Sequence, residues 1–371
     1  RVGPFTSYDQ CDRLVSFLGD THPVFHGSVV NAIASAKRFY PEIMKAMQAR
    51  QGSLDVNDYE VFSAKIEQRL RSSVVGIQVR GDDLLELTVR SPQVAKTMYP
   101  GQFCRLQTYE SMAESVNGTQ LHMEALAALA IPHQADPQCV RFIIKTIGVS
   151  SRIAARLQVG QRLSVMGPTG AKFILPEHKT VVVMGAELAL AQTLAMSRAL
   201  REQGSKLVYV SLLSSKNHAD FLPELQRACD HVMHAEGNDE ALALFTDFLL
   251  QADVNVEQIQ QIQVFGGVDL LKAVQAARST RWADVLMHDI KFVGSVFGPM
   301  QCMLKGVCAQ CLQWQLDPTT GQRTKAVYAC SWQAQPMELI DIDNLNERLV
   351  QNRLQEGLTQ LWLEHCLTAP Q

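Results

Sequence analysis

Four of the nine cysteines in this 371-residue chain lie close together, between residues 298 and 330. Three follow a Cys-x5-Cys-x2-Cys pattern and the fourth comes after eighteen further residues; they are Cys302, Cys308, Cys311 and Cys330. Gly306 lies in the loop between the first two, where the absence of a Cβ lets the backbone approach a bound group closely. Closely spaced thiolates with a fourth sulfur from a separate segment are typical of metal sites. We therefore expect these four cysteines to be metal ligands.

Two kinds of metal centre use such a set, an iron–sulfur cluster and structural zinc. Four-cysteine zinc sites usually show two similar Cys-x2-Cys knuckles, whereas here three cysteines stand together and Cys330 stands alone. This asymmetric grouping favours a [2Fe-2S] cluster; structural zinc, or four thiols that bind no metal, are the alternatives. Residues 317–321, Asp-Pro-Thr-Thr-Gly, are typical of a hairpin turn. We expect this turn to bring Cys330 back beside the other three cysteines on a β-ribbon.

The composition of the chain disfavours several classes of partner. It is 47% hydrophobic, which is enough for two or three domain cores. A net charge of −3 and an isoelectric point of about 6.4 favour neither a nucleic acid nor an anionic membrane as partner. No stretch of eighteen apolar residues occurs, so we expect no membrane insertion. The cysteines are grouped like metal ligands rather than spread like a disulfide scaffold, which indicates a reducing, cytoplasmic location.

The N-terminal segment lacks the pattern of a complete domain. A Gly-Asp pair, Gly19 and Asp20, ends an expected strand, and small residues between positions 27 and 36 predict a closely packed helix that is capped near His26 or Gly27. Apolar residues at helical spacing over residues 43–71 predict a linker of two helices. We therefore expect a tail and a linker here.

The sequence pattern then changes twice. Five β-type runs predict a small antiparallel barrel; they are residues 73–79, 84–89, 102–106, 140–147 and 162–166. From residue 180 strands alternate with helices, which predicts a parallel sheet, and residues 344–365 predict one final amphipathic helix. The expected fold class is therefore α/β plus β-barrel. Its expected parts are a helical tail and linker (1–72), an antiparallel β-barrel (73–175), a parallel α/β domain of nucleotide-binding type (176–290), the cysteine loop (291–340) and a C-terminal helix (341–371).

This order of parts resembles the ferredoxin reductase superfamily, in particular the iron–sulfur electron-transfer subunit of dihydroorotate dehydrogenase and the small subunit of NADH-dependent ferredoxin:NADP oxidoreductase. The motifs that carry the resemblance are Pro-Gly-Gln-Phe at 100–103, Gly-Val-Ser-Ser at 148–151, Gly160, Gly-Pro-Thr-Gly at 167–170, Phe-Gly-Gly at 265–267 and the four cysteines. The resemblance implies a ferredoxin-reductase-like barrel, a nucleotide-type α/β domain and a C-terminal iron–sulfur loop.

The resemblance also implies cofactors. In this family a nicotinamide passes a hydride to FAD, and the flavin passes single electrons to the cluster. By this resemblance Gly148, Ser150 and Ser151 would hold the pyrophosphate of FAD; the alternative is an ordinary turn that leads into a helix. The four cysteines would hold [2Fe-2S]. FAD is therefore a candidate cofactor.

Residues 1–40 resemble a different family. They are similar to the closing segment of a pyridine nucleotide-disulfide oxidoreductase domain, in which a Gly-Asp pair contacts the flavin. By that resemblance Asp20 would contact a flavin; the alternative is an ordinary strand-to-helix turn. The rest of such a domain does not occur in this sequence. The expected partner is therefore an upstream flavoprotein domain or a partner oxidoreductase subunit.

Two motifs depart from the ferredoxin reductase pattern. The Arg-x-x-Ser segment that clasps the flavin has its nearest counterpart at residues 105–108, Arg-Leu-Gln-Thr, which lacks the serine. The glycine-rich turn that admits a nicotinamide dinucleotide is replaced by Gly185, Ala186 and Glu187. The carboxylate of Glu187 would lie where an anion binds at a helix N-terminus. We therefore predict weak or absent binding of NAD(P) at this turn.

The sequence supports two functions. The first is an electron-transfer module of a larger flavin-dependent oxidoreductase, linked to NAD(P)H or ferredoxin, that relays electrons between a flavin and an acceptor through a [2Fe-2S] cluster. The second is a non-catalytic scaffold subunit with degenerate nucleotide sites, in which the cysteines hold a structural zinc or cluster. The asymmetric cysteines favour the first function, and the altered nucleotide motifs favour the second.

Overall fold

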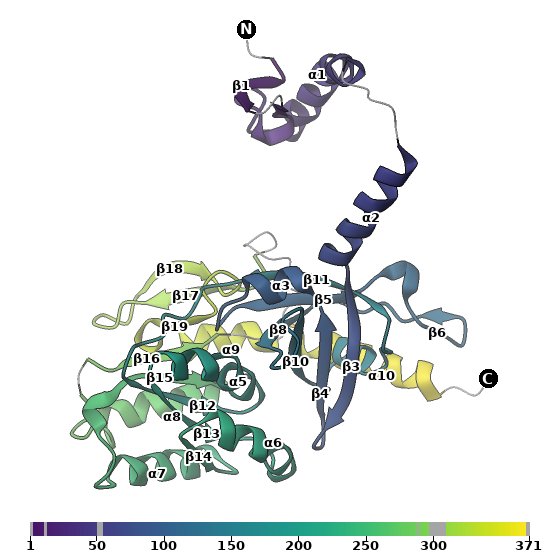
Figure 1. The fold of residues 1–371 in the computed structure, drawn as a ribbon. Coiled ribbons are helices and arrows are strands. Elements are labelled where there is room, and N and C mark those ends of the chain that lie inside the picture. Colours follow the sequence, from purple (N-terminus) through teal and green to yellow (C-terminus); the bar gives the residue numbers. More distant parts are fainter. Residues whose placement is uncertain (1–2, 11–12, 50–54, 288, 297–308, 369–371) are drawn as a thin grey trace. The chain divides into compact units, whose positions relative to one another are not determined.

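A computed structural model describes residues 3–10, 13–49, 55–287, 289–296 and 309–368 (Figure 1). The chain divides into two compact units, Arg1–Lys65 and Ile66–Gln371. Among the described residues, no helix combines the length and the apolarity needed to cross a lipid bilayer.

The first unit is a short hairpin followed by a long helix. It contains β1 (Phe5–Gln10), β2 (Arg13–Ser16), η1 (Gly19–Thr21) and α1 (Val29–Gln48), and α2 (Val56–Leu70) continues from it into the second unit. The cap was predicted near His26 or Gly27, and the structure places it one residue after Gly27: Ser28 caps α1, because its hydroxyl accepts a hydrogen bond from the N–H of Asn31 at 3.2 Å. The predicted strand also ends earlier, at Ser16, so that the Gly-Asp pair lies in the η1 turn.

The second unit begins with an antiparallel sheet of seven strands. Their order is β8 (Leu126–Leu129), β5 (Phe103–Thr108), β11 (Arg162–Thr169), β3 (Ser72–Arg80), β4 (Leu84–Arg90), β10 (Cys139–Lys145) and β9 (Ile131–Pro132). Along β4, the fully buried Leu85, Leu87 and Val89 alternate with partly exposed residues, so one face of the sheet forms a core. The edge strands β8 and β9 pair with β5 and β10 and not with each other. The sheet is therefore a half-barrel and not the closed barrel that the strand pattern predicts.

Short elements connect the strands of the half-barrel. They are α3 (Pro92–Thr97), η2 (Glu110–Met112), β6 (Ser115–Val116), β7 (Thr119–Gln120) and α4 (Val149–Ala154). Of these, α4 carries the residues that the family resemblance assigns to FAD.

A second sheet of six strands follows. Their order is β14 (His231–His234), β13 (Lys206–Ser211), β12 (Thr180–Gly185), β15 (Ile259–Phe265), β16 (Lys291–Ser295) and β19 (Ala334–Pro336). All neighbours are parallel except β16 and β19. Val181 to Met184 in β12 have no exposed surface, as expected for a parallel strand that is covered on both faces. The predicted parallel α/β arrangement is thus confirmed.

Helices and 3-10 turns join the strands of this sheet. They are α5 (Glu187–Glu202), α6 (Ser215–Ala228), α7 (Asn238–Leu249), η3 (Val256–Gln258) and α8 (Val268–Ser279). The sequence pattern did not predict α6, because polar residues surround its few buried apolar ones, Phe221 and Leu225. Helix α5 contacts strands of both sheets.

The C-terminal region contains a hairpin and two helices. The hairpin consists of β17 (Leu312–Leu316) and β18 (Arg323–Tyr328), and η4 (Met337–Leu339), α9 (Ile342–Val350) and α10 (Arg353–Thr368) follow β19. The prediction of one final helix is wrong. Leu345 of α9 belongs to the core of the parallel sheet, whereas Leu363 of α10 belongs to the core of the half-barrel. Because two different cores bury these residues, the helix is broken between Val350 and Arg353.

A buried charge network fastens α6 to the half-barrel. The Nε of Arg141 on β10 lies 2.9 Å from Glu86 of β4, and its Nη1 lies 2.6 Å from Glu224 of α6. Burial alone would lower the pKa of Arg141, but these two carboxylates outweigh burial and raise it. A guanidinium group that remains charged therefore holds α6 against the half-barrel.

Candidate functional site

The structure brings the last two of the four cysteines together at the base of the β17–β18 hairpin. Cys311 and Cys330 are only 6% and 3% exposed. The N–H of Cys330 donates to the Sγ of Cys311 at 3.4 Å, a type of hydrogen bond that tunes cysteine ligands in iron–sulfur sites. Cys302 and Cys308 lie outside the described residues, and the described ranges contain no group of three or more His, Cys, Asp or Glu side chains that could hold a metal ion.

The hairpin that returns Cys330 has the predicted turn. The Oδ1 of Asp317 accepts hydrogen bonds from the N–H groups of Thr320 at 3.0 Å and Thr319 at 2.8 Å, and these bonds lower the pKa of the Asp317 carboxyl. Gly321 has a φ of +69°, which glycine adopts without strain. The predicted turn is confirmed, and so is the return of Cys330 to the side of Cys311.

Gln333 ties the segment after Cys330 to the half-barrel. Its amide is 1% exposed. The Oε1 accepts a hydrogen bond from the N–H of Ala171 at 2.8 Å, and the Nε2 donates to the carbonyl of Ala171 at 2.7 Å and to the carbonyl of Gly101. Sequence reasoning missed this residue, because a glutamine that pairs with backbone groups more than 160 positions away leaves no local signal.

Two glycines of the family motifs make room for side chains in this region, Gly170 for Gln333 and Gly101 for Phe173. Gly170 has a φ of +89°, and a Cβ there would lie 2.7 Å from the Oε1 of Gln333. Gly101 has a φ of +88°, and a Cβ there would lie 2.0 Å from the ring of Phe173. Both separations are shorter than any real Cβ contact, so each position requires glycine for the packing of this region.

The residues assigned to the FAD pyrophosphate lie at the start of α4. Gly148 is its N-cap, and its N–H donates to the hydroxyl of Ser151 at 3.0 Å, while that hydroxyl donates to the carbonyl of Gly148 at 2.9 Å. Ser151 is buried and its hydroxyl is thus occupied within the chain. The hydroxyl of Ser150 makes no hydrogen bond to any residue that the structure describes. Of the two serines, Ser150 is therefore the one with an available hydroxyl.

Helix α10 covers part of this turn. The Nε2 of Gln360 donates to the carbonyl of Ile147 at 2.9 Å, and Glu364 forms an ion pair with Arg152 of α4 at 3.2 Å. Leu363, between these two residues, is fully buried in the core of the half-barrel. A ligand at the start of α4 would therefore have α10 as its neighbour.

Glu187 occupies the first turn of α5, as the sequence predicts. Its Oε1 lies 2.6 Å from the Nζ of Lys145. Burial alone would lower the pKa of Lys145, but Glu187 and the more distant Asp83 outweigh it and raise the pKa. A carboxylate at a helix N-terminus interacts favourably with the helix dipole and competes with a bound anion.

Gly185, before this turn, has a structural role of its own. Its φ is +141°, and a Cβ there would lie 1.9 Å from the carbonyl oxygen of Phe265. The neighbouring strand thus requires glycine at this position whether or not a nucleotide binds.

Arg105 has an unsatisfied group on the outer face of β5. Its Nη2 donates to Gln107 at 2.5 Å and its Nη1 lies 3.5 Å from the sulfur of Met166. The Nε is buried and has no partner among the residues that the structure describes. Arg105 is the nearest counterpart of the flavin-clasping arginine, and a buried donor without a partner suits a group that binds there.

Asp20 lies in the first unit, on the exposed η1 turn. Its Oδ1 accepts a hydrogen bond from the N–H of Gly27 at 2.7 Å, and the hydroxyl of Ser35 in α1 accepts one from the N–H of Gly19 at 2.7 Å. The Gly-Asp turn is therefore fastened to the helix that follows, and one oxygen of the carboxylate is used to do so.

A half-barrel followed by a parallel sheet defines a ferredoxin reductase-like fold. No protein-family model matches the chain. A chain of the solved NADH-dependent reduced ferredoxin-NADP oxidoreductase has this fold, with a TM-score of 0.63 and 19% sequence identity over 79% of the present chain and 98% of that chain.

Sequence relatives agree with the fold. Protein RP006 of Rickettsia prowazekii is 27% identical over 344 residues, which are 93% of this chain and 41% of that protein. This chain thus spans less than half the length of the Rickettsia protein. The electron transfer subunit of dihydroorotate dehydrogenase B from Shouchella clausii is 25% identical over 215 residues, 56% of this chain and 77% of that subunit. The chain is a distant homologue of that electron transfer subunit.

Proposed function

We propose that this chain is the electron-transfer module of a larger flavin-dependent oxidoreductase, with a [2Fe-2S] cluster on Cys302, Cys308, Cys311 and Cys330. The contact between Cys311 and Cys330 carries the proposal. Two buried thiols share a hairpin base with an N–H donor that points at sulfur, which is the environment of cluster ligands. When bound, such a cluster accepts and donates one electron at a time. The homology to an electron transfer subunit supports this role, and we propose a reducing cytoplasm as the location.

Metal analysis of anaerobically purified protein tests this proposal. We expect about two iron and two acid-labile sulfide per chain, and visible absorption bands that bleach with dithionite. Cys330→Ser should lose iron and sulfide. Cys229→Ser is the matched control, because Cys229 ends α6 on the parallel sheet, away from the hairpin in the fold. Protein that contains neither iron nor sulfide would refute the cluster.

We propose FAD as the second cofactor, with the Nε of Arg105 and the hydroxyl of Ser150 as its ligands in this chain. The buried Nε without a partner among the described residues supports this assignment. The flavin supplies the conversion between hydride transfer and single-electron transfer. Titration with FAD, followed by flavin fluorescence, should saturate for the native protein and weaken in Arg105→Ala. Equal affinity in the two proteins would contradict the assignment.

We also propose that NAD(P) does not bind at the turn before α5. The Glu187–Lys145 ion pair supports this, because it puts a carboxylate at the N-terminus of the helix and neutralises the nearby cation. Titration with NADH should show no saturable binding, and tight binding by the native protein would contradict it.

The proposed partner is a flavoprotein domain that covers α1. Val29, Val30 and Ile33 of α1 are largely exposed, and exposed apolar clusters mark surfaces that other proteins or domains cover. In this proposal Asp20 contacts the flavin of that domain. Asp20→Asn in the protein that is joined to its flavin domain should lower the flavin content, and an unchanged content would remove Asp20 from the proposal.

The second candidate function is a non-catalytic scaffold with structural zinc. The Glu187–Lys145 pair and the cover of α10 over α4 favour it, because both reduce the space for nucleotides. One zinc per chain in a colourless protein would support the scaffold and exclude the electron relay.

A further inference from the structure

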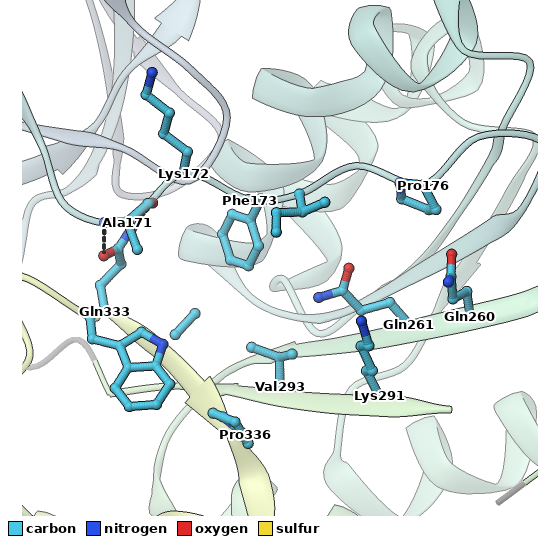
Figure 2. A pocket seen from close by; sticks show the side chains of 13 residues that line it. Ala171, Lys172, Phe173, Pro176, Gln260, Gln261, Lys291, Val293, Gln333 and Pro336 are labelled. Carbon is cyan, nitrogen blue, oxygen red and sulfur yellow. Dashed lines mark hydrogen bonds between the residues drawn. The ribbon is translucent and has the colours of Figure 1, made fainter. Parts of the chain in front are cut away.

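A cavity of about 390 Å³ lies at the edge of the parallel sheet (Figure 2). It is bounded by the first residues of β15 and β16 and by residues 171–176, the segment that leads from the half-barrel into the sheet. The cavity exists because β19 is short: its three residues pair only with residues 293–295 of β16. The start of β16 is therefore left without a strand on its outer side. Cavities of this size hold small organic molecules.

The wall formed by residues 171–176 is held in place at both ends. Gln333 bonds the N–H and the carbonyl of Ala171, as Figure 2 shows for the first of these contacts. At the other end, the hydroxyl of Ser205 donates to the carbonyl of Pro176 at 2.6 Å. The cavity is therefore preformed, and a ligand need not order its walls.

The cavity has an apolar side and a polar end. Phe173, Val293 and Pro336 provide apolar surface. Gln261 and Lys291 are register partners on neighbouring strands, so their side chains stand side by side on one face (Figure 2). Neither side chain forms a hydrogen bond or an ion pair within the part of the chain that the structure describes.

Next to the cavity lies Gln263, a buried glutamine whose side-chain amide is unsatisfied within the described residues. It follows Gln261 by two positions on the same face of β15 and is the register partner of Val293. Its side chain is fully buried, and neither its Nε2 nor its Oε1 has a partner among the described residues. Buried amides in native proteins are nearly always bonded, so this one points to a polar group that the described part of the chain does not supply.

The charge at the cavity is positive. Its charged lining residues are two lysines, Lys172 and Lys291. The ammonium group of Lys172 lies 3.5 Å from the centre of the Tyr99 ring, and its side chain points away from the cavity (Figure 2). Lys291 therefore provides the cation at the polar end.

We propose that this cavity binds a small planar aromatic molecule that carries one negative charge. Its ring lies against Phe173 and Val293, and its anionic group meets the ammonium of Lys291. Apolar walls and one convergent polar end are complementary to such an amphipathic anion. The residues that line the cavity do not include those of the turns before α4 and α5, whereas Trp332 and Gln333 line it and follow Cys330 by two and three positions.

The test uses 2-naphthoate and its neutral analogue 2-naphthamide as probes, with the full chain in isothermal titration calorimetry. We expect saturable binding of 2-naphthoate. Lys291→Gln should weaken that binding about five-fold, which is the most that an exposed ion pair contributes, and should leave 2-naphthamide unaffected. Lys172→Gln, the matched control, should change neither affinity, and Phe173→Leu should weaken both probes.

Three results would overturn the proposal. The first is no saturable binding of 2-naphthoate at millimolar concentration. The second is an affinity of Lys291→Gln for 2-naphthoate that equals that of the native protein. A loss of affinity that is the same for both probes, or that Lys172→Gln shows as well, would overturn the proposal in the same way. The third is an unchanged affinity of Phe173→Leu for both probes, which would put the bound molecule elsewhere.

Discussion

Replacing Gln333 by alanine should destabilise the unit formed by residues 66–371. The change removes three hydrogen bonds and leaves the carbonyl of Gly101, and the N–H and carbonyl of Ala171, without their partner. Gly101 is buried, so its carbonyl bears the full cost of about 1–3 kcal/mol for an unsatisfied group. Ala171 is partly exposed, so each of its groups loses only the net value of a hydrogen bond, about 0.5–1.5 kcal/mol. Together these losses should lower the free energy of unfolding by about 2–6 kcal/mol.

Urea unfolding followed by tryptophan fluorescence measures this loss. All four tryptophans belong to this unit, so the signal does not report on the first unit; they are Trp282, Trp314, Trp332 and Trp362. Gln93→Ala, at an exposed position of α3, is the matched control and should change the free energy of unfolding by less than about 0.5 kcal/mol. Gln333→Glu should lose at least as much as the alanine variant, because a carboxylate cannot donate to the two carbonyls. A loss below about 1 kcal/mol in Gln333→Ala would refute the reasoning, since it would mean that water replaces all three contacts.

Two further predictions concern charge. Arg141→Ala should lower the free energy of unfolding by about 3–5 kcal/mol in the same urea assay, because it leaves the poorly exposed carboxylate of Glu224 without its cation, whereas Glu86 keeps its ion pair with Arg80. Arg198→Ala, which breaks an exposed pair, is the control, and similar small losses in both variants would contradict the prediction. Burial, followed by the charge of His234, whose ring centroid is 4.1 Å away, lowers the pKa of His218 below its ordinary value of 6.5. The unfolded chain therefore takes up more protons as the pH falls, so this contribution to stability is complete above pH 6.5 and is lost below it. In His218→Gln the free energy of unfolding should therefore decrease less steeply as the pH falls below 6.5. An unchanged dependence on pH would show that another group causes the decrease.

Local patterns predicted much of the fold. The alternating residues of β4 and the uniformly apolar run of β12 identify strands. A strand that is buried on one face alternates apolar and polar residues, and a strand that is buried on both faces is apolar throughout. The turn at Asp317 was predictable for the same reason, since its hydrogen bonds reach only two or three residues along the chain. The prediction of a single C-terminal helix was wrong. The amphipathic pattern of residues 344–365 does not indicate that its two halves pack against two different hydrophobic cores.

Residue order alone establishes the spacing of the cysteines, the turn that returns Cys330 and the carboxylate at the start of α5. Three contacts depend on the packing of distant segments: Gln333 reaches Gly101, 232 positions away, Lys145 neutralises Glu187, and α10 lies over α4. The physical reason is that a turn is stabilised by neighbours in the chain, whereas these contacts depend on how two sheets and a terminal helix pack. Any polar side chain that arrives at the right place can make such a contact, so no local pattern marks it beforehand.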